Sequence, residues 1–273
     1  MKNIKSKMKT AFAIAITVIA MASCKKDTYN SIENIPPPAP NVQATFIKAS
    51  GDITNALAEF RHIIGDSLNT KPNANPLGRR EINWDAVPSN LTNNANFPLN
   101  FFNNTDPDAP AGRKRGFVLE GGSSFRVDST NFSEIDHSYA AQFQPFSPKR
   151  VFAYLGNNVT IGKFKVPGSN FDASVKAFGV IFSDVDDDNS TMVEFLSGNT
   201  SLGIFKAPKR SGNTGFSFVG VFFPNDEITT VKIISGNGLL APGVKDVSDG
   251  GSLDLVVMDD FLYSEPRGFK VAL

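Results

Sequence analysis

From Arg80 onward the chain is a series of short β-branched and aromatic segments, separated by Gly, Pro, Asn and Asp. Strand-like segments with turn residues between them and no helical period are typical of antiparallel sheets packed face to face. The 24 phenylalanines fit this fold, since bulky side chains from two inner faces fill a sandwich core. The sequence therefore predicts a mostly β single domain over residues 45–273, an antiparallel β-sandwich or jelly roll. The clearest predicted strands are 163–166, 175–182, 191–195, 216–223, 230–234 and 253–258.

One segment before the strands has a helical period. Between Thr45 and Gly65 apolar residues recur mostly every three or four positions, as in an amphipathic helix. Asp52 is the expected N-cap and Gly65 the expected C-cap, so the helix should span Ile53 to Ile64. We expect this N-terminal helix to pack against the sandwich.

The first 23 residues have the pattern of a secretory signal. A lysine-rich start without acidic residues precedes the apolar run 11–21, which is about half the ~20 residues that a membrane-spanning helix needs. The run ends in Met21-Ala-Ser-Cys24, which resembles a bacterial lipobox, and Cys24 is the only cysteine of the chain. The alternative is a plain signal peptide followed by an unrelated cysteine. We predict a lipoprotein signal peptide over residues 1–23 and lipidation of Cys24, whose acyl chains would anchor the protein in a membrane.

Residues 24–44 are predicted to form a tether. They include Pro36-Pro-Pro-Ala-Pro40, and prolines favour an extended polyproline II conformation that acts as a semi-rigid spacer. The start of this segment resembles that of Bacteroidetes-type lipoproteins. The resemblance implies a lipid-anchored protein of the cell envelope, at a Gram-negative outer membrane.

Composition excludes several classes of function. The 27 basic and 27 acidic residues give a formal net charge of zero, so no nucleic-acid partner is expected. One cysteine excludes a disulfide framework or a Cys-based zinc site within the chain. Neither His62 nor His137 lies in a catalytic motif, and the sequence contains no nucleophile elbow, zinc helix or phosphate loop. We therefore predict no catalytic residues.

The segment Asp184-Val-Asp-Asp-Asp188 is the best candidate for metal chemistry. Hard cations such as Ca²⁺ bind several carboxylate and carbonyl oxygens on short loops. The alternate positions Asp184, Asp186 and Asp188 match the opening of an EF-hand loop, but the glycine and glutamate that complete that motif are absent. The sequence predicts a possible calcium cofactor in a sandwich loop. The alternative is a solvated acidic loop.

Asp259 and Asp260 lie in an otherwise apolar segment, 255–263. Alternation along a strand would put them on opposite faces, so that one points inward. A buried carboxylate must be paired, hydrogen-bonded or metal-bound. The segment is similar to the last strand of carbohydrate-binding sandwiches in which an Asp holds structural calcium, which makes Asp260 a fourth candidate metal ligand. The alternative is a buried carboxylate that accepts backbone N–H bonds or pairs with Arg79, Arg80 or Arg115.

Trp84 is the only tryptophan and the candidate ligand-binding residue, because sugar-binding modules use exposed aromatic faces. The alternative is a role in core packing.

Several segments, taken in their order along the chain, resemble an uncharacterised family of secreted bacterial β-sandwich proteins. Some members carry a C-terminal sorting tail of the PEP-CTERM kind. The resemblance covers roughly residues 50–266 and implies fold and location more than activity. This chain differs by stopping at Leu273 without such a tail, so the N-terminal lipid would provide the anchor. The segments are 78–88, 101–103, 115–117, 146–148, 178–186, 235–237 and 256–263.

Together these features predict a lipid-anchored, non-catalytic β-sandwich of the cell envelope that binds or adheres to a glycan, matrix or protein ligand. Two alternatives stay open. One is an extracellular polysaccharide hydrolase that uses an Asp/Glu pair, and the other is a purely structural component of the envelope or matrix.

Overall fold

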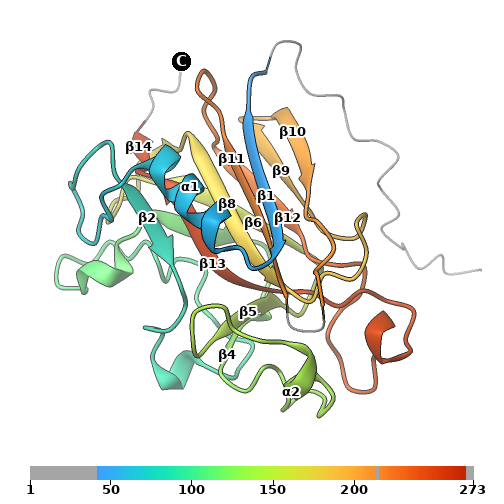
Figure 1. The fold of residues 1–273 in the computed structure, drawn as a ribbon. Helices are drawn as coiled ribbons and strands as arrows, with labels where there is room; N and C mark the ends of the chain where they lie inside the picture. Colours follow the sequence, from blue (N-terminus) through green and yellow to red (C-terminus); the bar gives the residue numbers. More distant parts are fainter. Residues whose placement is uncertain (1–41, 213–214, 269–273) are drawn as a thin grey trace, which may run out of the picture. The chain divides into compact units, whose positions relative to one another are not determined.

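The computed structural model describes residues 42–212 and 215–268 (Figure 1). The predicted signal peptide, Cys24 and all but the last three residues of the predicted tether lie outside these ranges. Two antiparallel sheets pack together, which confirms the predicted β-sandwich. One amphipathic helix near the N-terminus, α1 (Thr54–Ile64), is confirmed as well.

Seven strands form the first sheet, and all their pairings are antiparallel. The strand β2 pairs with β13 beside the main path of the sheet. In order across the sheet the strands are β1 (Thr45–Gly51), β11 (Phe216–Phe222), β8 (Ala177–Ser183), β13 (Val257–Ser264), β5 (Val151–Tyr154) and β4 (Phe125–Asp128), with β2 (Arg79–Ile82) off this path.

The second sheet also has seven antiparallel strands, and β3 pairs with β6 beside the main path. Short helical turns occur in the connections between strands. The strands are β10 (Thr200–Lys206), β9 (Met192–Ser197), β12 (Thr230–Ile234), β6 (Val159–Lys165), β7 (Asp172–Ser174) and β14 (Arg267–Gly268), with β3 (Phe117–Glu120) off this path. The helical turns are α2 (Tyr139–Gln142), η1 (Ser89–Leu91), η2 (Ala111–Arg113) and η3 (Val247–Asp249).

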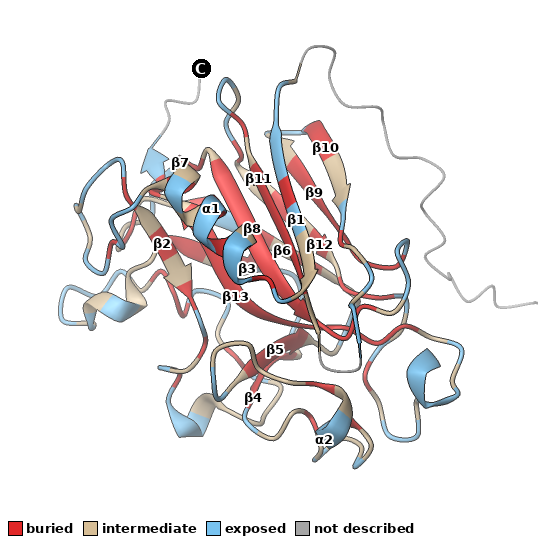
Figure 2. Cartoon of the chain, in the orientation of Figure 1, coloured by how far each residue is buried: buried red, intermediate tan, exposed pale blue. Residues whose placement is uncertain are grey.

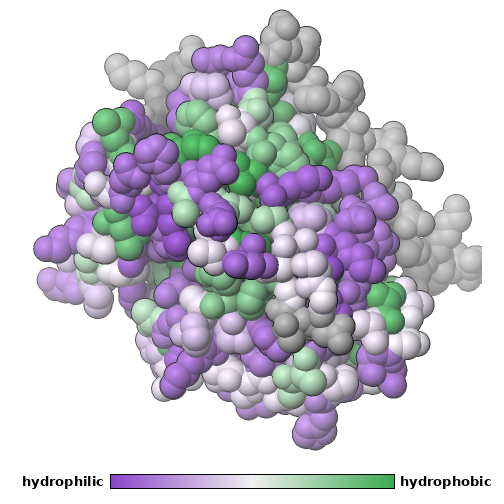
Figure 3. Space-filling model, viewed as in Figure 1, coloured by the Kyte–Doolittle hydropathy of each residue, from purple (hydrophilic) through white to green (hydrophobic). Residues whose placement is uncertain are grey.

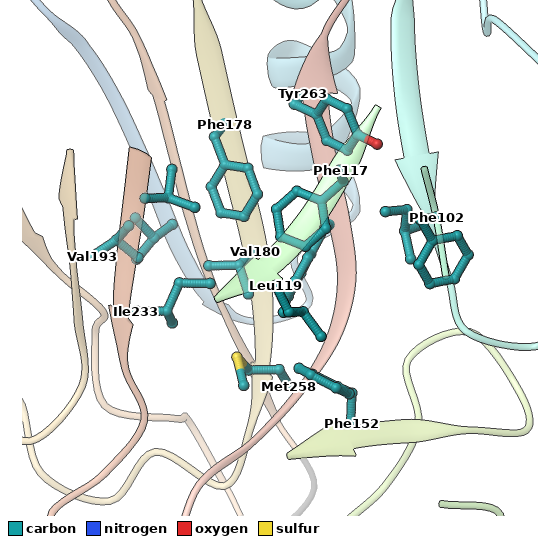
Figure 4. Packing of buried hydrophobic residues seen from close by; sticks show 14 of the residues in the cluster. Phe102, Phe117, Leu119, Phe152, Phe178, Val180, Val193, Ile233, Met258 and Tyr263 are labelled. Carbon is teal, nitrogen blue, oxygen red and sulfur yellow. The ribbon is translucent and has the colours of Figure 1, made fainter. Parts of the chain in front are cut away.

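The main core lies between the two sheets and is rich in phenylalanine (Figure 4). Phe178 on β8 contacts Phe261 edge to face, with 5.4 Å between the ring centroids, and Phe117 on β3 contacts Phe261 at 5.5 Å. Every residue of β8 is buried, because one face packs on the second sheet and the other is covered by α1 (Figure 2). This explains why the sequence of β8 is a continuous apolar run instead of an alternating one.

A second core joins α1 to the outer face of the first sheet. Phe60 is fully buried there, above Gly179 of β8 and Gly220 of β11, which are paired in register. A Cβ atom would lie 2.7 Å from the Phe60 ring at Gly179 and 2.8 Å at Gly220. The two glycines therefore let the helix approach the sheet closely.

The structure corrects the N-terminal boundary of the helical segment. Residues 45–51 form the edge strand β1, although their apolar residues fitted the helical period. Ile47 packs beneath α1, whereas the neighbouring Phe46 contacts Phe205 of the second sheet, with ring centroids 5.0 Å apart. Adjacent residues thus serve opposite faces, as in a strand. The helix ends at Ile64 with Gly65 as its C-cap, as predicted. Its N-cap is Ile53 and not the predicted Asp52, although Asp52 Oδ1 accepts a hydrogen bond from the Thr54 amide at 3.0 Å.

The last long strand is also shifted. The prediction placed it at 253–258, but β13 spans Val257–Ser264. Asp254 and Leu255 precede the strand because they bond to other loops: Asp254 accepts backbone N–H groups from residues 186 and 187, and the Leu255 amide donates to Asp246.

Strand register defines two ends of the sandwich. Thr45, at the start of β1, pairs with Phe222, which pairs with Ala177, and the predicted tether reaches the domain here; we call this the tether end. Gly51 pairs with Phe216, which pairs with Ser183; we call this the opposite end. A seven-residue strand separates the two ends by about 20 Å. Among the described helices, none is long and apolar enough to cross a membrane.

Candidate metal centre

The segment that follows β8 carries two of the predicted metal ligands to the opposite end of the sandwich. Asp184 comes directly after the last residue of β8 and has a left-handed backbone, φ 74°, which turns the chain out of the sheet. Val185 inserts into the main core, and the Asp184 and Asp186 side chains lie on the other side of the turn, at 0% and 8% exposure. Both carboxylates are therefore held in a buried site by a short, well-packed segment.

Asp246 completes the group from a distant loop. One carboxylate oxygen from each of Asp184, Asp186 and Asp246 lies within 4.8 Å of the others. Asp246 is fully buried at the start of η3, where its Oδ1 accepts the Ser248 amide at 2.7 Å and its Oδ2 accepts the Leu255 amide at 2.7 Å. These bonds fix the carboxylate in place. Three acidic residues in this arrangement could hold a metal ion.

Arg210 is the cation of the cluster. It follows β10, and its backbone amide donates to the Val185 carbonyl at 2.8 Å, which ties the two loops together. Its Nε lies 2.7 Å from Asp186 Oδ1, and its Nη1 forms an ion pair with Asp184 Oδ1. One guanidinium therefore faces three buried carboxylates.

Burial of the cluster changes the pKa values of its carboxyl groups. Burial raises the pKa of Asp184 to about 7, and the Arg210 charge opposes this shift only in part. Asp184 Oδ1 is in ion-pair contact with Arg210, and a hydrogen bond from Gln142 also lowers the Asp184 pKa. Burial raises the pKa of Asp246. At Asp186 burial also acts to raise the pKa, but the hydrogen bonds from Arg210 and Asp246 and the charges of Arg210 and Lys209 together lower it.

Asp254 holds the acidic loop in position by accepting hydrogen bonds from it. Its Oδ1 accepts the Asp186 amide at 3.0 Å, its Oδ2 accepts the Asp187 amide at 3.1 Å, and Ser190 Oγ donates to Oδ2 as well. Asp254 is thus a positioning residue for the acidic loop, with both oxygens occupied by protein donors.

The structure brings together only two of the four predicted metal residues. Asp188 is exposed, and its Oδ1 accepts the Lys209 amide at 2.8 Å. Asp260 is buried on β13 in a separate group beneath α1. In its place the cluster contains Asp246, which the sequence analysis did not identify. The Asp-x-Ser pattern at 246–248 signals a helical cap, which is what it forms, and gives no sign of a metal site.

Asp259 and Asp260 do not point to opposite faces as predicted. The pairing of β13 with β8 shifts register between Met258 and Phe261, which is the signature of a β-bulge. Asp259 Oδ2 accepts the Phe146 and Ser147 amides at 2.5 and 3.1 Å, and Ser147 Oγ donates to Asp260 Oδ1 at 2.7 Å. The backbone-bonded alternative therefore describes Asp259, whereas Asp260 accepts from a serine hydroxyl.

Arg79, Arg80 and Arg115 do not form ion pairs with Asp259 or Asp260 in the described structure. Arg80 is fully buried and pairs with Glu265 at 2.7 Å, and Arg79 pairs with Glu81 at 2.6 Å. Arg115 donates to backbone carbonyls instead.

Trp84 is a core residue. It is 1% exposed, stacks on Phe152 with 4.0 Å between ring centroids, and donates Nε1–H to the Asp259 carbonyl at 2.9 Å. A ring buried on all sides cannot offer its face to a sugar, which corrects its assignment as a ligand-binding residue. Cys24 lies outside the described residues, so its lipidation stays a prediction.

No protein-family model matches this chain, and no curated protein or solved structure is significantly similar to it. The function must therefore be argued from the chain itself. The residues that offer most for this argument are the three carboxylates and Arg210 at the opposite end of the sandwich.

Proposed function

We propose that this protein is a lipid-anchored, non-catalytic binding module of the cell envelope, in which calcium stabilises the loops at the opposite end of the sandwich. Cys24 would carry the lipid, and residues 24–44 would form the tether. The ligand is a glycan, a matrix component or a surface protein. The observation that carries the calcium part of the proposal is the meeting of Asp184, Asp186 and Asp246.

A bound cation would act on this cluster in two ways. It would offset the negative charge that a single guanidinium leaves uncompensated, which reduces the cost of keeping the carboxylates buried. It would also link the β8–β9 loop to the segment that begins at Asp246, so two distant parts of the chain would be held in one arrangement. Calcium suits the site because it takes carboxylate, carbonyl and water oxygens in irregular geometry, and extracellular modules bind it weakly.

The position of the cluster fits a displayed module. The acidic loop follows Ser183 at the opposite end, about 20 Å from the residue where the tether reaches β1. The cation site would therefore lie at the end of the domain away from the residue where the tether joins it. A cation there would stabilise the domain and leave the tether end free.

The test is thermal and chemical unfolding of the full chain, purified in detergent, with excess Ca²⁺ and with chelator. We expect Ca²⁺ to stabilise the protein by about 2.7 kcal/mol at one hundred times its Kd, because it binds only the folded state. Asp184→Asn and Asp246→Asn should abolish this shift. The matched control is Asp188→Asn, an exposed acid of the same loop that should keep the full shift.

Direct titration with Ca²⁺ by calorimetry covers the case in which Asp246→Asn fails to fold, since Asp246 also caps η3. A parent protein that shows neither heat of binding nor a stability shift with Ca²⁺ overturns the calcium part of the proposal. A shift that Asp188→Asn abolishes as completely as Asp184→Asn would place the metal elsewhere.

A further inference from the structure

A cleft of about 590 Å³ with a mixed polar and apolar lining opens at the tether end of the domain, far from the acidic cluster. The C-terminal turn of α1, Asp66, Lys176 and Glu227 contribute to its lining. The loop at 75–78 and the segment at 264–267 line the rest. The volume lies in the range of small-molecule sites, about 300–1,000 Å³.

Lys176 and Glu227 are held in position by hydrogen bonds. Lys176 Nζ forms an ion pair with Glu227 Oε1 at 3.0 Å, and Ser174 Oγ donates to Glu227 Oε2 at 2.6 Å. The Lys176 and Glu227 side chains are 36% and 47% exposed, and Lys176 Nζ also donates to the Asp226 carbonyl at 3.1 Å. The cleft thus presents a positioned donor beside a positioned acceptor.

The charges of the cleft balance. Lys176 and Glu227 neutralise each other, and Glu265 is matched by buried Arg80. Among the other lining residues Asp66 and Arg267 have opposite signs, and His62 Nδ1 lies 3.1 Å from Asp66 Oδ1. A strongly anionic or cationic ligand therefore finds no excess of opposite charge here.

Apolar groups complete the lining. Ile64, Leu77 and Phe222 contribute hydrocarbon surface between the polar side chains, and Leu77 is 74% exposed. The face that carries α1 likewise has apolar residues in small areas among hydrophilic ones (Figure 3). A ligand that fits such a lining is neutral, carries both donors and acceptors, and has C–H surface of its own.

We propose that this cleft binds a neutral oligosaccharide, with Lys176 donating to sugar hydroxyls and Glu227 accepting from them. The inference deepens the proposed function and rests on the protein being a binding module, because it names the ligand class and its site. Since the cleft opens at the tether end, the sugar could belong to a glycolipid headgroup at the membrane or to a free glycan chain. The recognition chemistry is the same in both cases.

The experiment is binding of the full chain, in a detergent without sugar groups, to an array of neutral, acidic and amino oligosaccharides. Hits are then titrated both as free sugars and as glycolipids in phosphatidylcholine vesicles. We expect saturable binding to neutral sugars, weakened about tenfold or more by Lys176→Ala and by Glu227→Gln, since each removes a charge-assisted hydrogen bond. Lys163→Ala is the matched control, because Lys163 forms an exposed ion pair with Glu120 on the second sheet.

A second readout needs no variant. Bound sugar should protect Lys176 of the parent protein from amine-specific labelling and leave Lys163 unprotected. Binding to both free sugar and glycolipid, or to either one, supports the inference and identifies the source. Neutral sugar binding that both cleft variants retain, or no binding to any neutral sugar, overturns it.

The calcium test separates this failure from that of the proposed metal site. If the protein gains stability with Ca²⁺ but binds no neutral sugar, only the assignment of the cleft is wrong. A protein that binds neutral sugar through Lys176 and Glu227 without a Ca²⁺ effect loses the metal assignment alone.

Discussion

Two groups of buried carboxylates in this domain are compensated in different ways. The cluster of Asp184, Asp186 and Asp246 lies between loops and contains the guanidinium of Arg210. The pair Asp259 and Asp260 lies on a β-bulge and, among the described residues, forms no ion pair. Burial and the neighbouring Asp260 raise the pKa of Asp259 to about 10, so this pair holds a proton at neutral pH.

The comparison shows that backbone context decides how a buried acid is compensated. Loops can bring a cation from elsewhere in the chain, and the same oxygens can serve a metal ion. The bulge on β13 instead places its carboxylates within hydrogen-bond distance of the 146–147 backbone amides and the Ser147 hydroxyl. There, backbone amides, a serine hydroxyl and a retained proton stabilise the buried carboxyl groups.

The largest effect is expected from removing the cation of the first group. Arg210→Ala leaves the carboxylates of the cluster without their counter-charge, so we expect a loss of about 3–5 kcal/mol in the free energy of unfolding at pH 8. Urea unfolding in the presence of chelator measures it. Lys209→Ala, an exposed neighbour, should change stability by less than about 0.5 kcal/mol. Equal stability of parent and Arg210→Ala would mean that the guanidinium does not compensate the cluster.

The proton of the second group predicts a pH dependence. An unfolded aspartate has a pKa near 3.9, so between that value and the raised pKa of Asp259 the folded state binds more protons than the unfolded state. Stability must therefore fall as pH rises, by up to about 1.4 kcal/mol per pH unit. Stability is best measured between pH 7.5 and 9.5, because this range lies above the pKa of Asp184, which is about 7.

The charged neighbours of the pair constrain this test. Arg61 on α1 and Glu81 on β2 act on Asp260 with opposite signs, and both stay ionised in the chosen window. Asp259→Asn should flatten the decline in stability between pH 7.5 and 9.5. A decline that persists unchanged in Asp259→Asn would assign it to other groups.

A smaller effect is expected at the hydroxyl of the second group. Ser147→Ala removes the donor to Asp260 Oδ1 and keeps the backbone amide that bonds Asp259, so the loss should be about 1–2 kcal/mol. Ser123→Ala, at an exposed serine, is the control and should be near neutral. If Ser147→Ala is as stable as the parent at pH 8, the hydroxyl does not contribute to holding the pair.

Sequence patterns recovered the elements whose signal is local. The helix at 54–64 and the strands β8, β9, β11 and β12 follow from runs of apolar residues that end at turn residues. Strands of two to four residues were missed because so few residues give too little pattern: β2, β3, β4, β5, β7 and β14. The seven-residue β10 was missed as well. The residues of the edge strand β1 were assigned to the helical segment. Three of them are only half-buried, so their sequence lacks the regular apolar–polar alternation that indicates a strand.

For the candidate site, the sequence identified Asp184 and Asp186 but assigned Asp188 and Asp260 wrongly to the same group of residues. Asp188 is turned outward by its bond to the Lys209 amide, and the bulge places Asp260 beside Asp259 beneath α1. Neither event has a signature in the sequence, because each depends on which distant segment supplies the partner.

The sequence by itself determined that residues 45 onward form a sandwich with a helix on it, since strand period, turn residues and helix caps are properties of neighbouring residues. Only the tertiary structure decided that Asp246 and Arg210 meet the acidic loop, and that Lys176 and Glu227 share a cleft with the end of α1. The physical reason is that strand order and register bring these residues together across long stretches of chain, and both are set by the packing of the whole core rather than by any local pattern.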